Sequence, residues 1–433
     1  MATSDSALER SALAKMGWRI LPLIGIAYAI AYIDRVNISF AAIQMNRDLG
    51  FSAAVYGLGA GVFFLSYALF EVPSNLLLVR FGARRWIARI MLTWGLLAAG
   101  MMFVQTPMQF YVMRFLLGMA EAGFFPGVIY YVSQWFPSVH RGRAISRFYV
   151  AIPLASVVMG LIAGPLLGLD GTHTLKGWQW LFLATGLPAI LMSGVILFLL
   201  PDKPETANWL SRDEKDWVIG RLADDAAKLG GGEDHNILRA LTHPVVLTLG
   251  AAHFLMLGSI YAFTFSAPEL LKGATGLSIT QVGLLISGVG LGGAVAMLTN
   301  GWSSDRARER YFHTAIPIGI MAISLGAIGL GLPPIGVMAA YGLATLAQMA
   351  FSPVIWAIPG ELLPPRMIAV GAAAINTLGQ TGSFVAPFLW GIAKDRTGDF
   401  QLGLTLLPIP MLTAVGLVLL LRRRSLRALA SGD

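Results

Sequence analysis

The chain of 433 residues contains no cysteine, which excludes disulfide bonds, a thiolate nucleophile and any metal site built on cysteine. Histidine is scarce as well: there are six, and His253 stands alone within its apolar segment, so we expect no metal cluster. The sequence also contains no P-loop of the kind that binds nucleotide phosphates. We therefore predict no bound cofactor.

Charged residues are also few: Asp, Glu, Lys and Arg make up only 12% of the chain, while hydrophobic residues make up 56%. This balance lies outside that of soluble globular domains. Apolar runs of roughly 20 residues, enough to cross about 30 Å of hydrocarbon, recur along the chain. They are too long for barrel strands, so we predict an all-α membrane protein with twelve transmembrane helices. The predicted spans are 19–42, 54–79, 86–104, 108–134, 146–168, 178–200, 245–268, 279–301, 314–332, 335–358, 367–393 and 401–421.

The net charge of +8 invites a nucleic-acid interpretation, but the basic residues alternate between loops as they do in membrane proteins. Arginine and lysine cluster before the first span, after the second, fourth and eighth, and after the twelfth. This positive-inside asymmetry predicts a multi-pass protein of the cell inner membrane with both termini in the cytoplasm, surrounded by lipid. Residues 1–17 are polar and show no signal-peptide pattern, so we expect the first span to remain in the mature protein.

A polar stretch divides the spans into two sets of six. Residues 201–244 hold nine of the 23 acidic residues, which predicts a cytoplasmic linker between an N-terminal bundle (1–200) and a C-terminal bundle (245–433). Within the linker, Ser211 and Glu214 fit a capping box at the start of a short helix. We expect an interfacial helix there, with Trp209, Leu210, Trp217 and Leu222 as its apolar side.

The two halves resemble each other at a constant offset of 226 residues. Ser52, Gly57, Arg80 and Arg84 match Ser278, Gly283, Arg306 and Arg310 at equivalent points of the second and eighth spans. Repeats of this kind allow transporters to place a site at the interface of two rocking halves.

Several motifs are similar to those of the major facilitator superfamily. The superfamily's loop signature G-x-x-x-D-R-x-x-x-R stands intact as Gly301, Asp305, Arg306 and Arg310, whereas in the first half Asn75 and Val79 replace the Gly and the Asp. The stretches YIDRVNIS (32–39), VPSNLLL (72–78), RFLLGMAEAGFFPG (114–127) and GWQWLF (177–182) resemble the anion:cation symporter family, which includes tartrate, galactonate and hydroxyphenylacetate permeases. The resemblance implies two pseudo-symmetric six-helix bundles that take up organic anions with protons, and it implies no enzymatic activity.

Five charged residues lie within the predicted spans, all in the first half: Asp34, Arg35, Glu71, Arg114 and Glu121. A charge at mid-membrane costs at least about 2.5–3.5 kcal/mol, so each needs a partner, a water-filled cavity or a function. Arg114 and Glu121 are two helical turns apart and cannot pair tightly with each other, so we expect their partners in the first span. An alternative is that Arg35 reaches the outer interface and Asp34 merely pairs with it. For Glu71 we favour a structural contact over a proton site.

Two arginines and two titratable acids suit the exchange of internal ion pairs for a bound anion and protons. The resemblance implies that Asp34 and Glu121 carry protons and that Arg35 and Arg114 contact the anion. It also places Tyr32, Tyr67, Trp356 and Asn376 on helices that face a central cavity. Taken singly, a Tyr or Trp in a span more often packs or anchors, but an amide such as that of Asn376 needs a partner.

The best prediction is a monomeric, proton-coupled importer of a small organic anion such as tartrate or a sugar acid. An aromatic carboxylate is the first alternative, an exporter or drug antiporter the second, and a membrane receptor that does not transport the third. Relatives often carry Glu where this chain has Thr185, which we expect to affect substrate choice or packing. Gly301, Asp305, Arg306 and Arg310 resemble the conformational latch of the superfamily, although orientation charges in a solvated loop explain them equally well.

Overall fold

The computed structural model describes residues 2–228, 241–363 and 365–431, and every regular element in these ranges is helical. The first half contains α1 (Ala2–Leu49), α2 (Ala53–Phe81), α3 (Ala83–Gly100), η1 (Met101–Phe103), α4 (Pro107–Glu121), α5 (Phe124–Ser133), α6 (Ser138–Tyr149), α7 (Ala151–Leu167), η2 (Thr172–Thr174), α8 (Gly177–Leu199), η3 (Pro204–Thr206) and α9 (Arg212–Lys228). The second half contains α11 (Pro244–Thr275), α12 (Ile279–Ala307), α13 (Tyr311–Gly329), α14 (Pro334–Phe351), η4 (Ile355–Ala357), α15 (Ile358–Leu362), α16 (Pro365–Thr397), α17 (Gln401–Leu406) and α18 (Pro408–Ser431).

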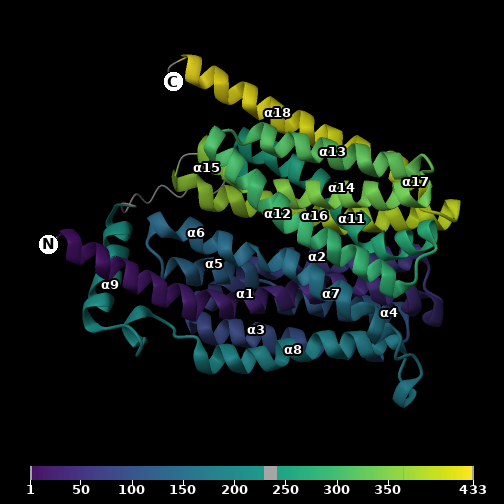
Figure 1. Ribbon diagram of the computed structural model, residues 1–433, viewed down its shortest axis with the longest axis horizontal. Coiled ribbons are helices and arrows are strands. Elements are labelled where there is room, and N and C mark those ends of the chain that lie inside the picture. The colour runs from purple at the N-terminus through teal and green to yellow at the C-terminus, as the bar shows by residue number, and fades with distance from the viewer. Residues whose placement is uncertain (1, 229–240, 364, 432–433) are drawn as a thin grey trace.

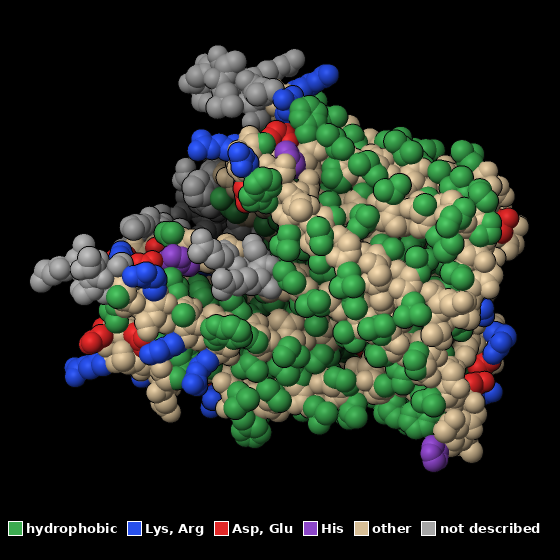
Figure 2. Space-filling view, viewed as in Figure 1, with side chains coloured by type: hydrophobic (Ala, Val, Ile, Leu, Met, Phe, Trp, Pro, Cys, Tyr) green, Lys and Arg blue, Asp and Glu red, His purple; other side chains and the backbone are tan. Residues whose placement is uncertain are grey.

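The described helices confirm the predicted all-helical membrane fold. Ten helical segments in these ranges are long and apolar enough to cross a membrane. The remaining two predicted spans are occupied by α7, an apolar helix of 17 residues, and by α16, which is 33 residues long but carries amide and hydroxyl side chains. Apolar side chains cover the surface between two ends where the charged side chains gather (Figure 2), as expected of a surface in contact with lipid.

Helices of the two halves pack around separate hydrophobic cores. One core is built mainly from α1–α9, and the other from α11–α18. In Figure 1 the N-terminal half, purple to blue, lies along the C-terminal half, green to yellow. Tyr261 and Phe265 of α11 belong to the first core, so the two cores meet at this helix.

The internal repeat predicted at an offset of 226 residues extends to helix boundaries. Helices α2 and α12 are each 29 residues long, and each begins with a serine cap, Ser52 or Ser278, whose side chain accepts a hydrogen bond from a backbone N–H of the first turn. The matching glycines lie where the halves touch. A Cβ on Gly57 would lie 2.2 Å from the carbonyl oxygen of Pro387, and one on Gly283 would lie 2.1 Å from that of Gly160.

We call the end of the molecule where α1 begins and α18 ends the terminal side, and the opposite end the far side (Figure 1). The halves are joined toward the far side. Asp395, near the end of α16, accepts hydrogen bonds from the backbone N–H groups of Ala53 and Ala54 at the start of α2 (2.8 and 2.9 Å). Deeper in, Phe64 of α2 packs against Tyr261 of α11 with ring centroids 4.3 Å apart. Figure 2 shows a recess between the halves at the terminal side.

Two boundaries in the first half differ from the predicted spans. Helix α1 has 48 residues, so the polar segment before the predicted first span continues the same helix. The predicted fifth span, 146–168, begins inside a separate amphipathic helix, α6, which meets α7 at Val150. A hydropathy pattern locates the part of a helix that crosses the membrane, but it does not detect polar turns that continue the same helix outside the lipid.

Helix α9 packs on the N-terminal half beside α1. The predicted capping box is present: the Glu214 carboxylate accepts from the Ser211 N–H at 2.8 Å, and the Ser211 hydroxyl accepts from the Glu214 N–H at 3.3 Å. The expected apolar side packs against the protein core, since Leu210 is buried and Trp209 stacks on Trp135 with ring centroids 5.7 Å apart. Contact of this helix with a lipid interface stays a prediction. Residues 229–240 of the predicted linker lie outside the described ranges.

Candidate functional site

A cavity lies between the two halves, with an empty volume of about 1030 Å³ including its open mouth. Five of the six predicted substrate-binding residues line it: Tyr32, Arg35, Tyr67, Trp356 and Asn376. The first three come from α1 and α2, and the other two from the opposite half, so the structure assembles the predicted set from both bundles.

Arg35 is the charged residue of this lining. It lies on α1, and its guanidinium forms an ion pair with Glu121 at the end of α4, a carboxylate that is 1% exposed. The guanidinium also lies 5.5 Å from the ring centroid of Tyr67 and 5.6 Å from that of Phe63. Arg35 thus faces the cavity while its charge is balanced from behind by a buried acid.

The helix carrying Glu121 is interrupted directly after it. We predicted one continuous span over 108–134, but α4 ends at Glu121 and α5 starts at Phe124. Gly123 has a φ of 84°, which favours glycine, and Pro126 follows, whose ring nitrogen has no hydrogen to donate. A Cβ on Gly123 would also lie 2.5 Å from the Ser74 hydroxyl. Interrupted helices of this kind often line transporter sites.

Asp34 takes a different set of partners from its neighbour Arg35. The Trp94 indole N–H donates to one carboxylate oxygen at 2.8 Å, and the Asn37 amide donates to the other at 2.9 Å. Asn37 also donates to the Thr185 hydroxyl at 2.7 Å. Asp34 is 2% exposed and forms no ion pair with any part of the chain that the structure describes, so our prediction of an arginine partner for it is not met.

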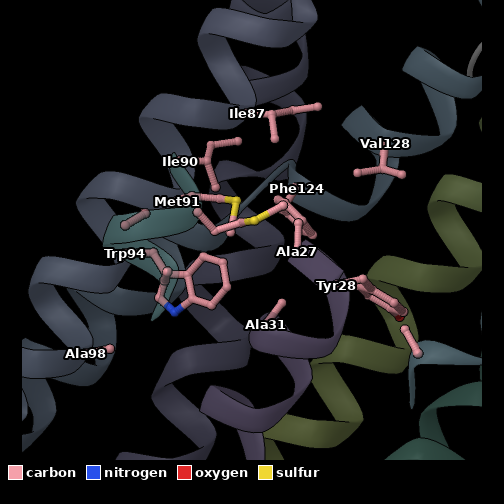
Figure 3. Packing of buried hydrophobic residues seen from close by; sticks show 14 of the residues in the cluster. Ala27, Tyr28, Ala31, Ile87, Ile90, Met91, Trp94, Ala98, Phe124 and Val128 are labelled. Carbon is pink, nitrogen blue, oxygen red and sulfur yellow. The ribbon is translucent and has the colours of Figure 1, made fainter. Parts of the chain in front are cut away.

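Small residues on α1 allow the indole to reach this carboxylate. Figure 3 shows Trp94 of α3 beside Ala31 of α1, with Ala27 one turn away. All three are essentially fully buried. A larger side chain at Ala31 would crowd the indole, so the small residue there leaves room for the donor on Asp34.

Arg114 does not line the cavity. It is 1% exposed, and its guanidinium donates to the backbone carbonyls of Gly59 and Ala60 on α2, both at 3.3 Å. The Phe63 ring, 4.8 Å from the guanidinium, also packs against Arg35. In this arrangement Arg114 joins α4 to α2, which corrects the expectation that it sits beside Arg35 as a second anion contact.

Glu71 and Asn376 link the two halves. The Asn376 amide donates to both carboxylate oxygens of Glu71, at 3.2 and 3.1 Å. Asn376 thereby has the partner that its apolar surroundings require. The contact agrees with our preference for a structural role of Glu71, and the partner comes from another span, the eleventh.

His253 is a cavity residue that the sequence did not point to. It lines the cavity from α11, is 4% exposed, and its ring lies 5.0 Å from that of Trp356 in an edge-on arrangement. Its Nδ1 atom has no hydrogen-bond partner among the described residues. A lone histidine in an apolar span was the available signal, but the helix face it occupies depends on tertiary packing. No group of three potential metal-binding side chains is present in the described ranges.

The predicted latch residues lie at the terminal side. Arg310 bonds Asp305 at 2.5 Å and approaches Glu361 at 3.4 Å, while Arg306 lies over the Trp302 ring at 5.4 Å. Gly301 has open space where a Cβ would point. The contacts that the structure gives these four residues stay within the C-terminal half.

The fold and this site define a multi-pass helical membrane transporter whose cavity lies between two halves. The sequence profile described as "Major Facilitator Superfamily" matches residues 24–387, and the chain belongs to that family.

Several relatives match over most of their length. The chain is 40% identical to a "Quinolone resistance transporter" of Acinetobacter baumannii, covering 95% of this chain and 94% of that protein. It is 42% identical to a "Putative tartrate transporter" of Agrobacterium vitis, covering 92% of each. It is similar in fold to the crystal structure of a D-xylose-proton symporter, with a TM-score of 0.73 at 16% identity over 93% of this chain and 97% of that one.

Proposed function

We propose that the protein is a secondary transporter that takes up a small organic anion together with protons. The observation that carries the proposal is the position of Arg35, which faces the cavity while Glu121 holds its guanidinium from behind. Arginine presents paired donors that match a carboxylate. An anion in the cavity therefore competes with Glu121 for the same cation.

Proton coupling follows from that competition. When an anion takes Arg35, the Glu121 carboxylate loses its counter-charge in a site that is 1% exposed. A buried charge without a partner neutralises by protonation or recovers a countercharge. Binding of the anion and of a proton to Glu121 thus support each other, and release of the proton restores the ion pair and weakens anion binding.

Asp34 is the second proposed proton carrier. Its carboxylate is buried with two neutral donors, Trp94 and Asn37, in place of a cation. It directly precedes Arg35 on the same helix. A change in its charge therefore alters the electrostatic environment of the anion contact without any movement of the backbone.

We further propose that the two bundles, 1–200 and 245–433, rock about the cavity with the terminal side in the cytoplasm. Basic clusters at that side support the orientation by the positive-inside rule. In the described conformation the halves are joined toward the far side, and the latch residues Asp305 and Arg310 contact each other. The opposite conformation would free them to bond across the terminal side.

Export is a second candidate, favoured by the relative named for quinolone resistance. The tartrate-named relatives favour uptake of a hydroxy-dicarboxylate. The two directions differ in their driving force: a symporter accumulates its anion when the vesicle interior is alkaline, whereas a proton antiporter accumulates substrate when the interior is acidic.

The test is uptake of radiolabelled carboxylates into proteoliposomes under an imposed pH gradient. We expect accumulation with an alkaline interior, and its loss in Glu121→Gln and Asp34→Asn while gradient-free exchange persists. Glu205→Gln, which changes an exposed acid outside the spans, serves as the control. Unchanged gradient-driven uptake in both acid variants would refute the proton-carrier assignment.

A further inference from the structure

A second cavity lies between the two halves at the far side, and we call it the far-side vestibule. Its empty volume is about 970 Å³ including its open mouth, and its walls come mainly from α1, α2, α11 and α16. It shares no lining residue with the cavity that contains Arg35. Beside it α2 and α16 are in close backbone contact, since a Cβ on Gly391 would lie 2.2 Å from the carbonyl oxygen of Ala53. The vestibule is therefore a separate space, next to the contact that closes the far side.

The charges of the vestibule favour an anionic ligand over a cationic one. The charged residues in its described lining are Arg47, Glu269, Lys394 and Asp395. Asp395 is already balanced, because it accepts two backbone N–H bonds at the N-terminus of α2, where the helix dipole is positive. The Arg47 side chain is 72% exposed and contacts Asp48 at 3.4 Å. Two cations thus face one remaining acid of the lining, Glu269.

Lys394 is the cation best placed to bind an anion inside the vestibule. Its ammonium contacts the Glu269 carboxylate at 2.5 Å and lies 4.2 Å from the ring centroid of Phe400. The Glu269 side chain is 39% exposed, so water can stabilise its carboxylate when the partner is lost. Both residues belong to the C-terminal half. An exchange of Glu269 for another carboxylate therefore breaks no contact between the halves.

The wall of the vestibule also has unused hydrogen-bonding capacity. Trp390 is 7% exposed, and its buried indole N–H has no partner in the described part of the chain. The buried Oδ1 atom of Asn46 also has none there. Ser266 adds a hydroxyl to the lining, whereas the Tyr56 hydroxyl is engaged, since it donates to the Phe265 carbonyl at 3.0 Å. Buried polar atoms require partners, and a bound molecule can supply them.

We propose that the far-side vestibule is a second, outer anion site, in which Lys394 exchanges Glu269 for the carboxylate of a small organic anion. The polar groups of Asn46, Ser266 and Trp390 hold the same molecule in place. This inference rests on the proposed function for the class of ligand, and it adds a site that the anion occupies while the halves are closed at the far side.

The experiment follows a thiol in the vestibule of the purified full chain. The chain has no cysteine, so Ala53→Cys places a sole thiol in the lining, and Arg35→Gln in the same protein weakens binding in the other cavity. Maleimide labelling is timed with sodium tartrate, gluconate or benzoate. We expect each acid to slow labelling, to about half the rate at its dissociation constant, which we expect to be about 1 mM. Thr172→Cys, an exposed position in η2, is the control thiol and should label at an unchanged rate.

Variants of the ion pair test whether Lys394 holds the anion. Lys394→Gln should raise the dissociation constant at least about tenfold, and Lys394→Arg, which keeps the charge, should recover most of the affinity. Glu269→Gln removes the competing carboxylate and should lower the dissociation constant about threefold. Arg396→Gln, an exposed neighbour, should change nothing.

Two results would overturn the outer site. One is equal slowing by the carboxylates in the parent and Lys394→Gln proteins, and the other is equal slowing by sodium chloride at the same concentration, which would show an unselective effect of anions. Either result would leave the proposed function standing where gradient-driven uptake occurs. Slowing that depends on Lys394, without gradient-driven uptake of any carboxylate, would support the outer site and overturn the proposed function.

Discussion

At the scale of single residues, the neighbours Asp34 and Arg35 have separate partners. Adjacent side chains of a helix point about 100° apart, so the two charges face different surroundings. Arg35 reaches the cavity and Glu121, whereas Asp34 is held by Trp94 and Asn37. Under the proposed function, this separation would let Arg35 meet an anion while Asp34 changes its protonation.

Arg114 gives the sharpest test of the residue assignments. We predict that Arg114→Gln lowers stability by about 1–3 kcal/mol, because two buried hydrogen bonds from a charged donor to α2 are lost, and changes anion affinity little in the variant that folds. Arg35→Gln should show the reverse pattern, with anion affinity reduced at least about tenfold. Thermal unfolding and calorimetry on the same samples measure both quantities. An Arg114→Gln protein with normal stability and lost anion binding would place Arg114 in the site.

Some of this site could be predicted from the sequence. Ionisable residues inside spans are costly enough to stand out, and that argument reached Arg35 and Glu121, while the need of a buried amide for a partner reached Asn376; all three have partners in the structure. The sequence could not show that Arg114 donates to backbone carbonyls of α2 or that Trp94 reaches Asp34. Those contacts depend on how each helix is rotated against its neighbours, which no local pattern encodes.

At the scale of helices, the start of α2 is held by a residue from the opposite bundle. The Asp395 carboxylate accepts from two N–H groups at the N-terminus of α2, where unpaired donors and the helix dipole favour a negative charge. Because this contact joins the halves at the far side, it stabilises the conformation that is closed there.

We therefore predict that Asp395→Asn shifts the protein toward opening at the far side, by about 1 kcal/mol or about fivefold in population. The chain has no cysteine, so Ser39→Cys, at a buried position between the halves, would be the sole thiol. Labelling by an impermeant maleimide from outside right-side-out vesicles should become faster in Asp395→Asn. Arg396→Gln, an exposed neighbour, should leave the rate unchanged, and equal rates in all three proteins would contradict the role of Asp395.

Helix α9 is attached to α1 through Glu214. Partial burial acts to raise the pKa of this carboxyl, but hydrogen bonds from Lys15, Ser11 and the Ser211 backbone outweigh it and lower the pKa to about 2. A depressed carboxyl pKa contributes stability that is present above the unfolded value, about 4.3, and is lost as the pH falls toward the folded value.

We predict that Glu214→Gln lowers the thermal unfolding temperature at pH 7, corresponding to about 1–3 kcal/mol for a charged hydrogen-bond network. The difference from the parent protein should shrink below pH about 4.5 and vanish toward pH 2. Asp213→Asn changes an exposed acid one residue away and is the control. A difference that stays constant across this pH range would show that the Glu214 charge does not hold α9.

Helix interruptions were the least predictable feature at this scale. The predicted spans 108–134 and 335–358 each contain a break, after Glu121 and after Phe351. Proline follows each break closely, at Pro126 and Pro353, but proline also lies within intact helices such as α1 and α8. Hydropathy therefore locates a span but not its interruption, because packing decides whether a proline is absorbed as a bend or ends the helix.

At the scale of the whole molecule, the internal repeat forms the interface between the two halves, and the cavity lies at that interface. Helices α2 and α12 have the same length and the same serine cap, and they lie 226 residues apart in the chain. Each packs through a glycine against the opposite half, α2 on α16 and α12 on α7. Glycine lets the backbones approach closely without interlocking side chains. Such an interface can separate and re-form as two bundles rock about a site between them.

Above all, we propose that an organic anion displaces Glu121 from Arg35 and that Glu121 then takes up a proton. The most direct measurement is proton uptake by the purified protein in weak buffer at pH 7. It is followed with an indicator dye while a carboxylate that binds the protein is added. We predict net proton uptake on anion binding by the parent protein, and anion binding with reduced proton uptake by Glu121→Gln. Anion binding without proton uptake in the parent protein, or equal uptake in both proteins, would contradict it.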